Sequence, residues 1–232
     1  MITMRRADQR GYTKLRWLDS RHTFSFNEYR DSEYSHFRKL RVINEDWIDP
    51  GQGFAAHPHR DMEILTWVLE GALEHRDSLG NGSIIRPGDL QRMTAGTGIL
   101  HSEFNHSKTA PVHLLQIWIF PDQKALTPEY EQKSFENGSL VDKFKLIAAG
   151  DGRNGAVALN QDVSFHIAKL SEGKLLRRGV DPNRHTWLQL AAGSITLNGN
   201  RMEIGDGAAV YEESVVEVEV IEKAELLLID LA

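Results

Sequence analysis

The segment from Gly51 to His59 decides the fold, and it reads GQGFAAHPH. Its two histidines are two residues apart, and in an extended strand this spacing points both imidazoles to the same face. A His-x-His pair on its own is often coincidental. Here it follows glycine turns, and polar rings on the inner face of a strand are costly to bury unless something satisfies them. We therefore interpret the pair as two metal ligands on one strand.

A second pair with the same spacing ends the segment from Gly96 to Glu103, which reads GTGILHSE. If the strand of His57 and His59 pairs with the strand of His101 and Glu103, all four side chains can point to one place. The chain has no cysteine, so a metal here must be bound by histidine nitrogen and carboxylate oxygen. Such a set suits Fe, Mn, Co, Ni or Zn.

Glu63 is the alternative carboxylate. It has the same parity as His57 and His59, provided that their strand continues unbroken past Asp61. A carboxylate in this position can be a metal ligand or can orient a ligand histidine from behind. The residues by themselves leave both glutamates open.

Short apolar runs rich in β-branched residues predict strands throughout the chain, at residues 40–44, 64–69, 113–120 and 214–220 among others. Turn signals separate them, at residues 70–71, 80–82, 87–89, 198–200 and 205–207. Many short strands at this spacing predict an all-β fold. One helix is expected at residues 128–135, because Thr127 can cap it, Pro128 suits its first turn, and two glutamates follow near its positive end.

A weak internal repeat predicts two similar halves. The segment TWVLEGAL at 66–73 resembles LQLAAGSI at 188–195, and each is followed by a Gly-Asp turn. Gly71 and Gly193 differ by 122 positions, and Gly88 and Gly205 by 117. We expect a first domain at residues 1–130 and a second at 131–232, with the boundary between residues 121 and 140.

The repeat also predicts that the second domain lacks a ligand set. The positions that match the two histidine-containing pairs are Gly179, Asp181, Val218 and Val220. His166 and His185 each stand alone there. In the first half, His22 and His36 are expected to pack or to bond to backbone, and His75, His106 and His113 have no partner at ligand spacing. The aromatic residues that could wall a pocket are Phe24, Phe26, Phe54 and Trp118.

Composition limits the function classes. The chain has 232 residues and a net charge of −6 without a basic stripe, which argues against direct nucleic-acid binding. Its apolar runs fall far short of the roughly 20 residues of a membrane span, and Met1 to Arg10 lacks the apolar core of a signal peptide. We expect a cytoplasmic protein.

Several motifs together resemble a known family. The segment from Gly51 through His57, His59 and Glu63 to Gly71 is similar to the first cupin motif, and Gly96 to Asn105 is similar to the second. The details resemble the pirins: HTFSF at 22–26 with Tyr29 and Asp31, HPHRDME at 57–63, TAGTGILHSE at 94–103 and LQIW at 115–118. The C-terminal half resembles pirins more loosely.

The resemblance implies a bicupin, an all-β protein of two tandem jelly-roll-like β-barrels with a few short helices. Pirins bind a metal in the N-terminal barrel only, through residues that fall here on His57, His59, His101 and Glu103. It favours Glu103 over Glu63 as the carboxylate. The implied ion is one divalent transition metal, Fe(II) in the first place, with Ni, Co, Mn, Zn or Cu as alternatives.

Bacterial pirins include quercetin 2,3-dioxygenases. The resemblance therefore implies an oxidoreductase whose substrates are dioxygen and a small aromatic compound such as a flavonol, with Glu103 as metal ligand and base. The alternative is a regulatory protein that acts through a protein partner and responds to the redox state of its metal. A third possibility is a cupin that turns over quercetin only incidentally to another substrate.

Overall fold

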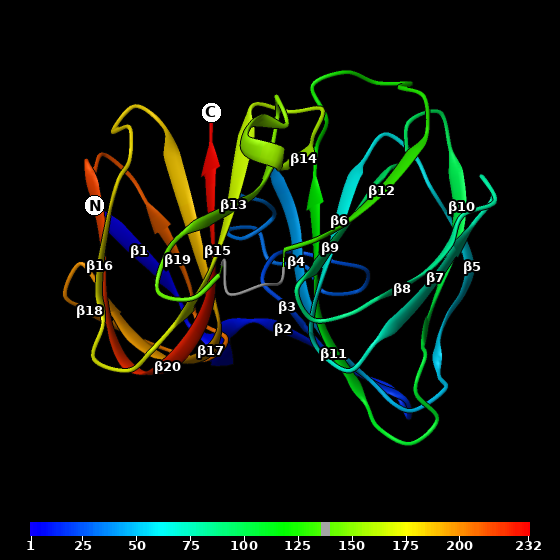
Figure 1. Cartoon of the computed structure of the whole chain (residues 1–232), viewed down its shortest axis with the longest axis horizontal. Coiled ribbons are helices and arrows are strands. Elements are labelled where there is room, and N and C mark those ends of the chain that lie inside the picture. Colours follow the sequence, from blue (N-terminus) through cyan, green and yellow to red (C-terminus); the bar gives the residue numbers. More distant parts are fainter. Residues whose placement is uncertain (136–139) are drawn as a thin grey trace. The chain divides into compact units, whose positions relative to one another are not determined.

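The computed structural model describes residues 1–135 and 140–232, and strands dominate it (Figure 1). Within these ranges the helical elements are two three-residue 3-10 helices, η1 (Ala7–Gln9) and η2 (Arg153–Gly155). The predicted all-β fold class is confirmed. No helix in this part of the chain is long and apolar enough to cross a membrane.

Backbone contacts divide the chain into two units, one of residues 11–135 and one of residues 1–10 together with 136–232. We call them the N-terminal and the C-terminal unit. This division differs from the expected domains 1–130 and 131–232 because the first residues belong to the second unit. There, β1 (Ile2–Arg5) pairs antiparallel with β19 (Gly207–Val210), and Arg6 forms an ion pair of 2.8 Å with Asp206. No local pattern in the sequence signals this pairing.

The N-terminal unit consists of two sheets. Strand order is β12-β9-β6-β11-β4-β3-β2 in a seven-stranded sheet and β5-β10-β7-β8 in a four-stranded one, among the residues described. The bounds of these strands are β2 (Gly11–Lys14), β3 (Leu18–His22), β4 (Leu40–Ile48), β5 (Gly53–His59), β6 (Glu63–Glu70), β7 (Leu73–Asp77), β8 (Gly82–Ile85), β9 (Asp89–Thr94), β10 (Ile99–Asn105), β11 (Val112–Ile119) and β12 (Glu129–Ser134).

The two sheets of this unit face each other across a shared core. Leu73 and Ile85 of the four-stranded sheet pack in one cluster with Ile48, Val68 and Leu114 of the seven-stranded sheet. Alternation along each strand sends these side chains inward. Backbone pairing in the described residues does not join the sheets into a closed ring, so the fold is a cupin-type pair of sheets and not the closed barrel that was expected.

In the described part of the C-terminal unit, the strands form one nine-stranded sheet built around two long strands. The bounds of its remaining strands are β13 (Lys145–Ala149), β14 (Val157–Ala158), β15 (Val163–Leu170), β16 (Leu175–Gly179), β17 (His185–Leu197), β18 (Asn200–Glu203) and β20 (Val215–Leu231). Register shifts between Leu190 and Ile195 bend β17 along β20. Val218 and Val220, at two of the positions that match the ligand pairs, are buried in its apolar core.

The glycines of the repeat have matching conformations. Gly71 and Gly193 have φ of 80° and 77°, and Gly88 and Gly205 have φ of 92° and 85°. These values lie in the left-handed region, which glycine enters without the steric cost of a Cβ atom. The repeat that the sequence predicts is therefore present in the backbone of both units.

The predicted helix at residues 128–135 is wrong. Residues 129–134 form strand β12, which pairs with β9 in antiparallel register. Glu129 and Glu131, which were interpreted as acidic residues of a first helical turn, instead form ion pairs of 3.1 and 3.2 Å with the buried guanidinium of Arg92. Alternate residues of a strand lie on one face, so one cation can bind both. Tertiary pairing overrides the local helix signals.

We expect Gly193→Ala to destabilise the protein more than Gly199→Ala. Both glycines have positive φ, 77° and 79°, but a Cβ atom on Gly193 would lie 2.1 Å from the carbonyl oxygen of Lys223, and nothing lies within 4 Å at Gly199. The expected difference is roughly 2 kcal/mol, because only the first substitution adds a backbone clash. Denaturant unfolding of both variants measures it, and equal midpoints would contradict the repeat geometry.

Candidate metal centre

Strand pairing brings together three of the four predicted ligands directly. β5 and β10 are antiparallel neighbours, with His101 opposite His57 and Ile99 opposite His59. The two-residue spacing of His57 and His59 keeps both rings on one face, as predicted. The register shifts between His101 and Glu103, because β5 has one extra residue between Phe54 and His57, and this bulge bends β5 at the site.

The three imidazoles form a compact triangle. Their ring centroids are 4.4 Å apart for His57 and His101 and 4.8 Å apart for each of the two pairs with His59. The Nε2 atoms of His57 and His101 are 3.0 Å apart. Two nitrogens on one ion at about 2.0 to 2.1 Å are themselves separated by roughly 3 Å. The three histidines can therefore hold a metal ion.

The protonation states of these rings suit metal binding. The Nδ1–H of His57 donates to the carbonyl of Ala55 over 2.8 Å, which leaves the lone pair on Nε2. Burial, followed by the neighbouring imidazoles, lowers the pKa of His59 to about 4. The same causes lower the pKa of His101 to about 3. At neutral pH His59 and His101 are therefore neutral, and their rings offer lone pairs that a cation can bind.

Glu103 lies two residues beyond His101 and is 2% exposed. Gln116 of β11 donates from Nε2 to Glu103 Oε2 over 2.8 Å, and Trp118 Nε1–H donates to Gln116 Oε1 over 3.0 Å. Trp118 thereby orients the amide so that its NH₂ group faces the carboxylate. The other carboxylate oxygen, Oε1, is buried without a hydrogen-bond partner. An oxygen left in this state fits a cation ligand, and burial raises the pKa of Glu103.

Glu63 lies away from this cluster. β5 ends at His59, Asp61 turns the chain with a φ of 51°, and Glu63 begins β6 in the other sheet. Ile64 is directly opposite Trp118, which lines the cavity described below, so Glu63 points to the opposite face of that sheet. The strand is therefore not continuous past Asp61, and the parity argument for Glu63 is wrong.

His75 is a neighbour of Glu103 and His101 that the sequence pattern did not predict. It lies opposite Glu103 on β7, is 0% exposed, and bonds through Nε2 to Asp77 over 3.1 Å. With His101 and Glu103 it forms a second group whose ligand atoms lie within 4.8 Å of one another. The His75-x-Asp77 spacing repeats the pattern of the other pairs, so parity could have indicated it.

A cavity of about 490 Å³ opens beside the histidines. Phe26, Phe54 and Trp118 line it, as predicted, whereas Phe24 is buried elsewhere in the core. Its polar residues include His22, which bonds to both Thr13 and Asn44 over 2.8 Å and lies with its ring centroid 5.2 Å from that of Phe26.

Ser20 and Asp46 are further polar residues of this cavity, and the serine hydroxyl donates to the carboxylate. They lie on β3 and β4. The sequence reading did not identify this polar wall because its members come from strands that are separate in sequence. The cavity therefore combines aromatic and hydrogen-bonding surfaces.

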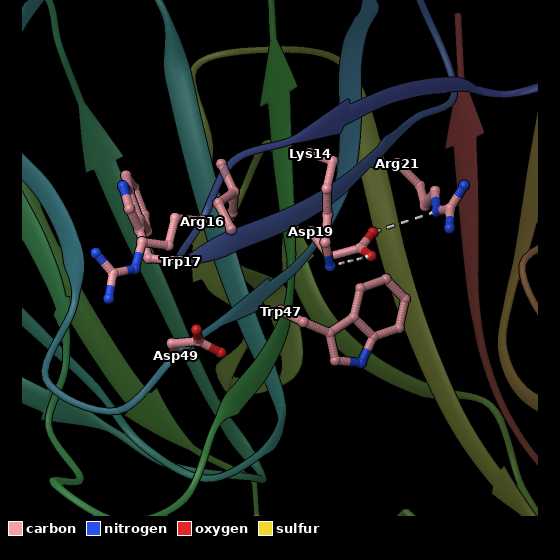
Figure 2. Close-up of a pocket in the computed structure, with 8 residues that line it drawn as sticks. Lys14, Arg16, Trp17, Asp19, Arg21, Trp47 and Asp49 are labelled. Carbon is pink, nitrogen blue, oxygen red and sulfur yellow. Dashed lines mark hydrogen bonds and ion pairs between the residues drawn. The ribbon is translucent and has the colours of Figure 1, made fainter.

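A second depression, of about 400 Å³, shares Leu18 with this cavity. Figure 2 shows its charged residues, with Asp19 between Lys14 and Arg21. The carboxylate is 2.9 Å from Lys14 Nζ and 3.5 Å from Arg21 Nε, so these cations are already neutralised within the chain. It contains no group of metal ligands among the described residues, and we assign the site to the larger cavity.

Comparison with known proteins agrees with these features. The pirin family model matches residues 3–119, and a model described as the quercetinase C-terminal cupin domain matches residues 146–231. The chain belongs to the pirin family. This confirms the resemblance deduced from the motifs.

Similar proteins extend over the whole chain. A protein of Escherichia coli strain K12 named quercetin 2,3-dioxygenase is 43% identical over 231 residues, covering 100% of this chain and 99% of that protein. A putative quercetin 2,3-dioxygenase of Mycobacterium tuberculosis is 46% identical, covering 90% of this chain and 85% of its own. The crystal structure of the bacterial pirin YhhW from E. coli in complex with nickel(II) has a TM-score of 0.94 at 43% identity, covering 100% and 99% of the two chains.

We expect His57→Ala and His101→Ala to weaken metal binding at least about tenfold, since each removes a donor of the triangle. His106→Ala, an exposed histidine of the same unit, and Glu63→Gln should retain wild-type metal content. Elemental analysis after equilibration with a limiting metal buffer measures this. Wild-type metal content in both His57→Ala and His101→Ala would contradict the assignment of these histidines as metal ligands.

Gln116→Leu should weaken metal binding by about 10- to 100-fold, because Glu103 Oε2 loses its buried donor. Trp118→Phe keeps the amide and removes only the group that orients it, so a smaller loss is expected. Competitive metal titration separates the two variants. Equal affinities in both variants and the wild type would show that the Trp118–Gln116–Glu103 relay has no role.

Proposed function

We propose that the protein is a metal-dependent dioxygenase that cleaves a flavonol such as quercetin. The observation that carries this proposal is a triangle of three imidazoles, one of which, His101, shares a second ligand group with the buried carboxylate of Glu103, at a 490 Å³ cavity. Full-length relatives named quercetin 2,3-dioxygenase support the same substrate class.

His57, His59, His101 and Glu103 are the residues that would hold the ion, with Fe(II) as the first choice. A divalent ion bound there would polarise a substrate hydroxyl and dioxygen as a Lewis acid and redox centre. His101 and Glu103 are buried, and burial strengthens the interactions of such charges. The backbone carbonyl of Ala55 keeps the His57 ring in its ligand tautomer.

Glu103 is the residue we assign as base. Its Oε1 has no partner within the protein, and its pKa is raised by burial, so it can take a proton from a flavonol hydroxyl. Gln116 holds the other oxygen at 2.8 Å and stabilises the charged form before the proton arrives. The amide thus positions the base without reacting.

The cavity fits a hydroxylated aromatic compound. Its volume lies within the roughly 300 to 1,000 Å³ of small-molecule sites, and Phe26, Phe54 and Trp118 offer ring faces and edges. On the polar side, the Asp46 carboxylate can accept a hydrogen bond from a phenolic hydroxyl. The combination favours a polyphenol over an aliphatic substrate.

Quercetin turnover tests the proposal. Metal-depleted protein is loaded anaerobically with Fe(II), Ni(II), Co(II), Mn(II), Cu(II) or Zn(II) in separate samples and then mixed with quercetin in air. We expect loss of the flavonol absorbance with at least one metal and a fall of about 100-fold or more in His59→Ala. His106→Ala, which removes an exposed histidine outside the cavity, should keep wild-type turnover.

The proposal fails if turnover is unchanged in His59→Ala, or if no loaded sample consumes quercetin while its metal content is stoichiometric. Measuring metal content in every variant separates a loss of binding from a loss of chemistry. Product analysis under ¹⁸O₂ adds a direct criterion, since a dioxygenase incorporates both labelled atoms.

A further inference from the structure

The C-terminal unit contains a second cavity, of about 350 Å³, that the proposed reaction does not use. It is lined by three cationic side chains, a histidine, an asparagine and two apolar side chains. These are Lys145, Arg153, Arg178, His166, Asn154, Phe144 and Leu146. No metal-ligand group occurs there among the described residues. His166, for which the sequence pattern indicated no partner, is therefore part of a polar cluster.

His166 and Arg178 are coupled at the centre of this cluster. They approach to 2.7 Å between His166 Nε2 and Arg178 Nη2. A guanidinium can only donate, so Nε2 accepts and the ring proton of the neutral imidazole is on Nδ1. Nδ1 is buried without a hydrogen-bond partner, and the whole residue is 4% exposed. Burial and the nearby Arg178 and Arg153 lower the pKa of His166 to about 3, which keeps the ring neutral.

Positive charge exceeds negative charge at this cavity. Arg153 forms an exposed ion pair with Asp151. Asp230 lies near Arg178 but pairs with Arg184 at 2.5 Å. Arg178 has no ion pair with any carboxylate of the described residues, although a half-buried guanidinium usually has one. Lys145 adds a further cation without an ion pair there.

Strand parity places the cluster on the inner side of the unit. His166 is two residues before Ala168, and Arg178 is two residues after Leu176, and both of these apolar residues belong to or pack on the core. His166 is also 122 residues after Asn44, the same offset that relates Gly193 to Gly71. Asn44 lines the cavity of the N-terminal unit. The second cavity is therefore the counterpart of the first, with different chemistry.

We propose that this cavity binds a small organic carboxylate. Arg178 supplies the paired donors that match a planar carboxylate, His166 Nε2 accepts from its Nη2 and orients the guanidinium, and Lys145 and Arg153 add attraction. Phe144 and Leu146 contact the apolar body of the ligand, which favours an aromatic or branched acid over an inorganic anion.

Binding of benzoate to the intact protein tests the site, with benzamide as the uncharged analogue of the same shape. Titration followed by ¹H–¹⁵N NMR should give saturable shifts at Phe144, His166 and Arg178 with benzoate and none with benzamide. Arg178→Gln should weaken benzoate binding about tenfold or more, since it removes a charge-assisted donor. Arg177→Gln is the matched control, because Arg177 is the exposed neighbour of Arg178 on the same strand and pairs with Glu217.

Two further measurements test whether benzoate binds at this cavity and not elsewhere in the protein. Benzoate could also reach a metal in the N-terminal unit, so the titration is repeated in His59→Ala, where the C-terminal site should keep its affinity. If Arg178→Gln does not fold, Lys145→Gln replaces it, with weaker binding and a smaller salt dependence expected. Equal binding of benzamide, tighter binding of inorganic phosphate, unchanged affinity in the folded cavity variant, or shifts elsewhere would each overturn the proposal. The readout is binding, so it is independent of quercetin turnover.

Discussion

The antiparallel pairing of β5 with β10 is the contact on which the candidate site depends. It brings His57 opposite His101, two residues that are 44 positions apart in the chain, and their Nε2 atoms approach to 3.0 Å. Burying such polar groups is costly, and the fold offsets the cost only in part. The carbonyl of Ala55 accepts a hydrogen bond from His57, and the amide of Gln116 donates one to Glu103 Oε2. The second carboxylate oxygen, Glu103 Oε1, remains buried without a hydrogen-bond partner and could bind a cation.

The two units show how one repeat supports different chemistry. Turn glycines at matching positions of the two units have the same left-handed backbone conformation. In the N-terminal unit, polar residues replace apolar ones on the inner face of β10. In the C-terminal unit the matching positions carry Val218 and Val220 in an apolar core, and polarity shifts to the Arg178–His166 pair on other strands. The turn glycines have matching conformations in the two halves of this chain, whereas the polar groups that line each cavity are set by individual side chains.

Three features of the structure differ from what local patterns indicate, and they share a physical cause. Residues 128–135 carry helix signals, yet pairing with β9 and two ion pairs to Arg92 stabilise a strand. Residues 2–5 follow no recognisable pattern that would assign them to the C-terminal unit, yet they pair with β19. Glu63 has the right parity only for an unbroken strand, and the turn at Asp61 changes sheets. In each case a contact between distant segments outweighs a local preference.

The sequence by itself determined the all-β class, the internal repeat, the pirin resemblance and the two pairs at 57–59 and 101–103, because strand parity and turn glycines are local properties. Only the tertiary structure showed that Glu103 shares a ligand group with His101 and His75, that Gln116 and Trp118 orient its carboxylate, and that the polar wall around Asp46 lies nearby. Those features depend on which strands become neighbours. That choice is made by burial of the whole core, and no single stretch of residues encodes it.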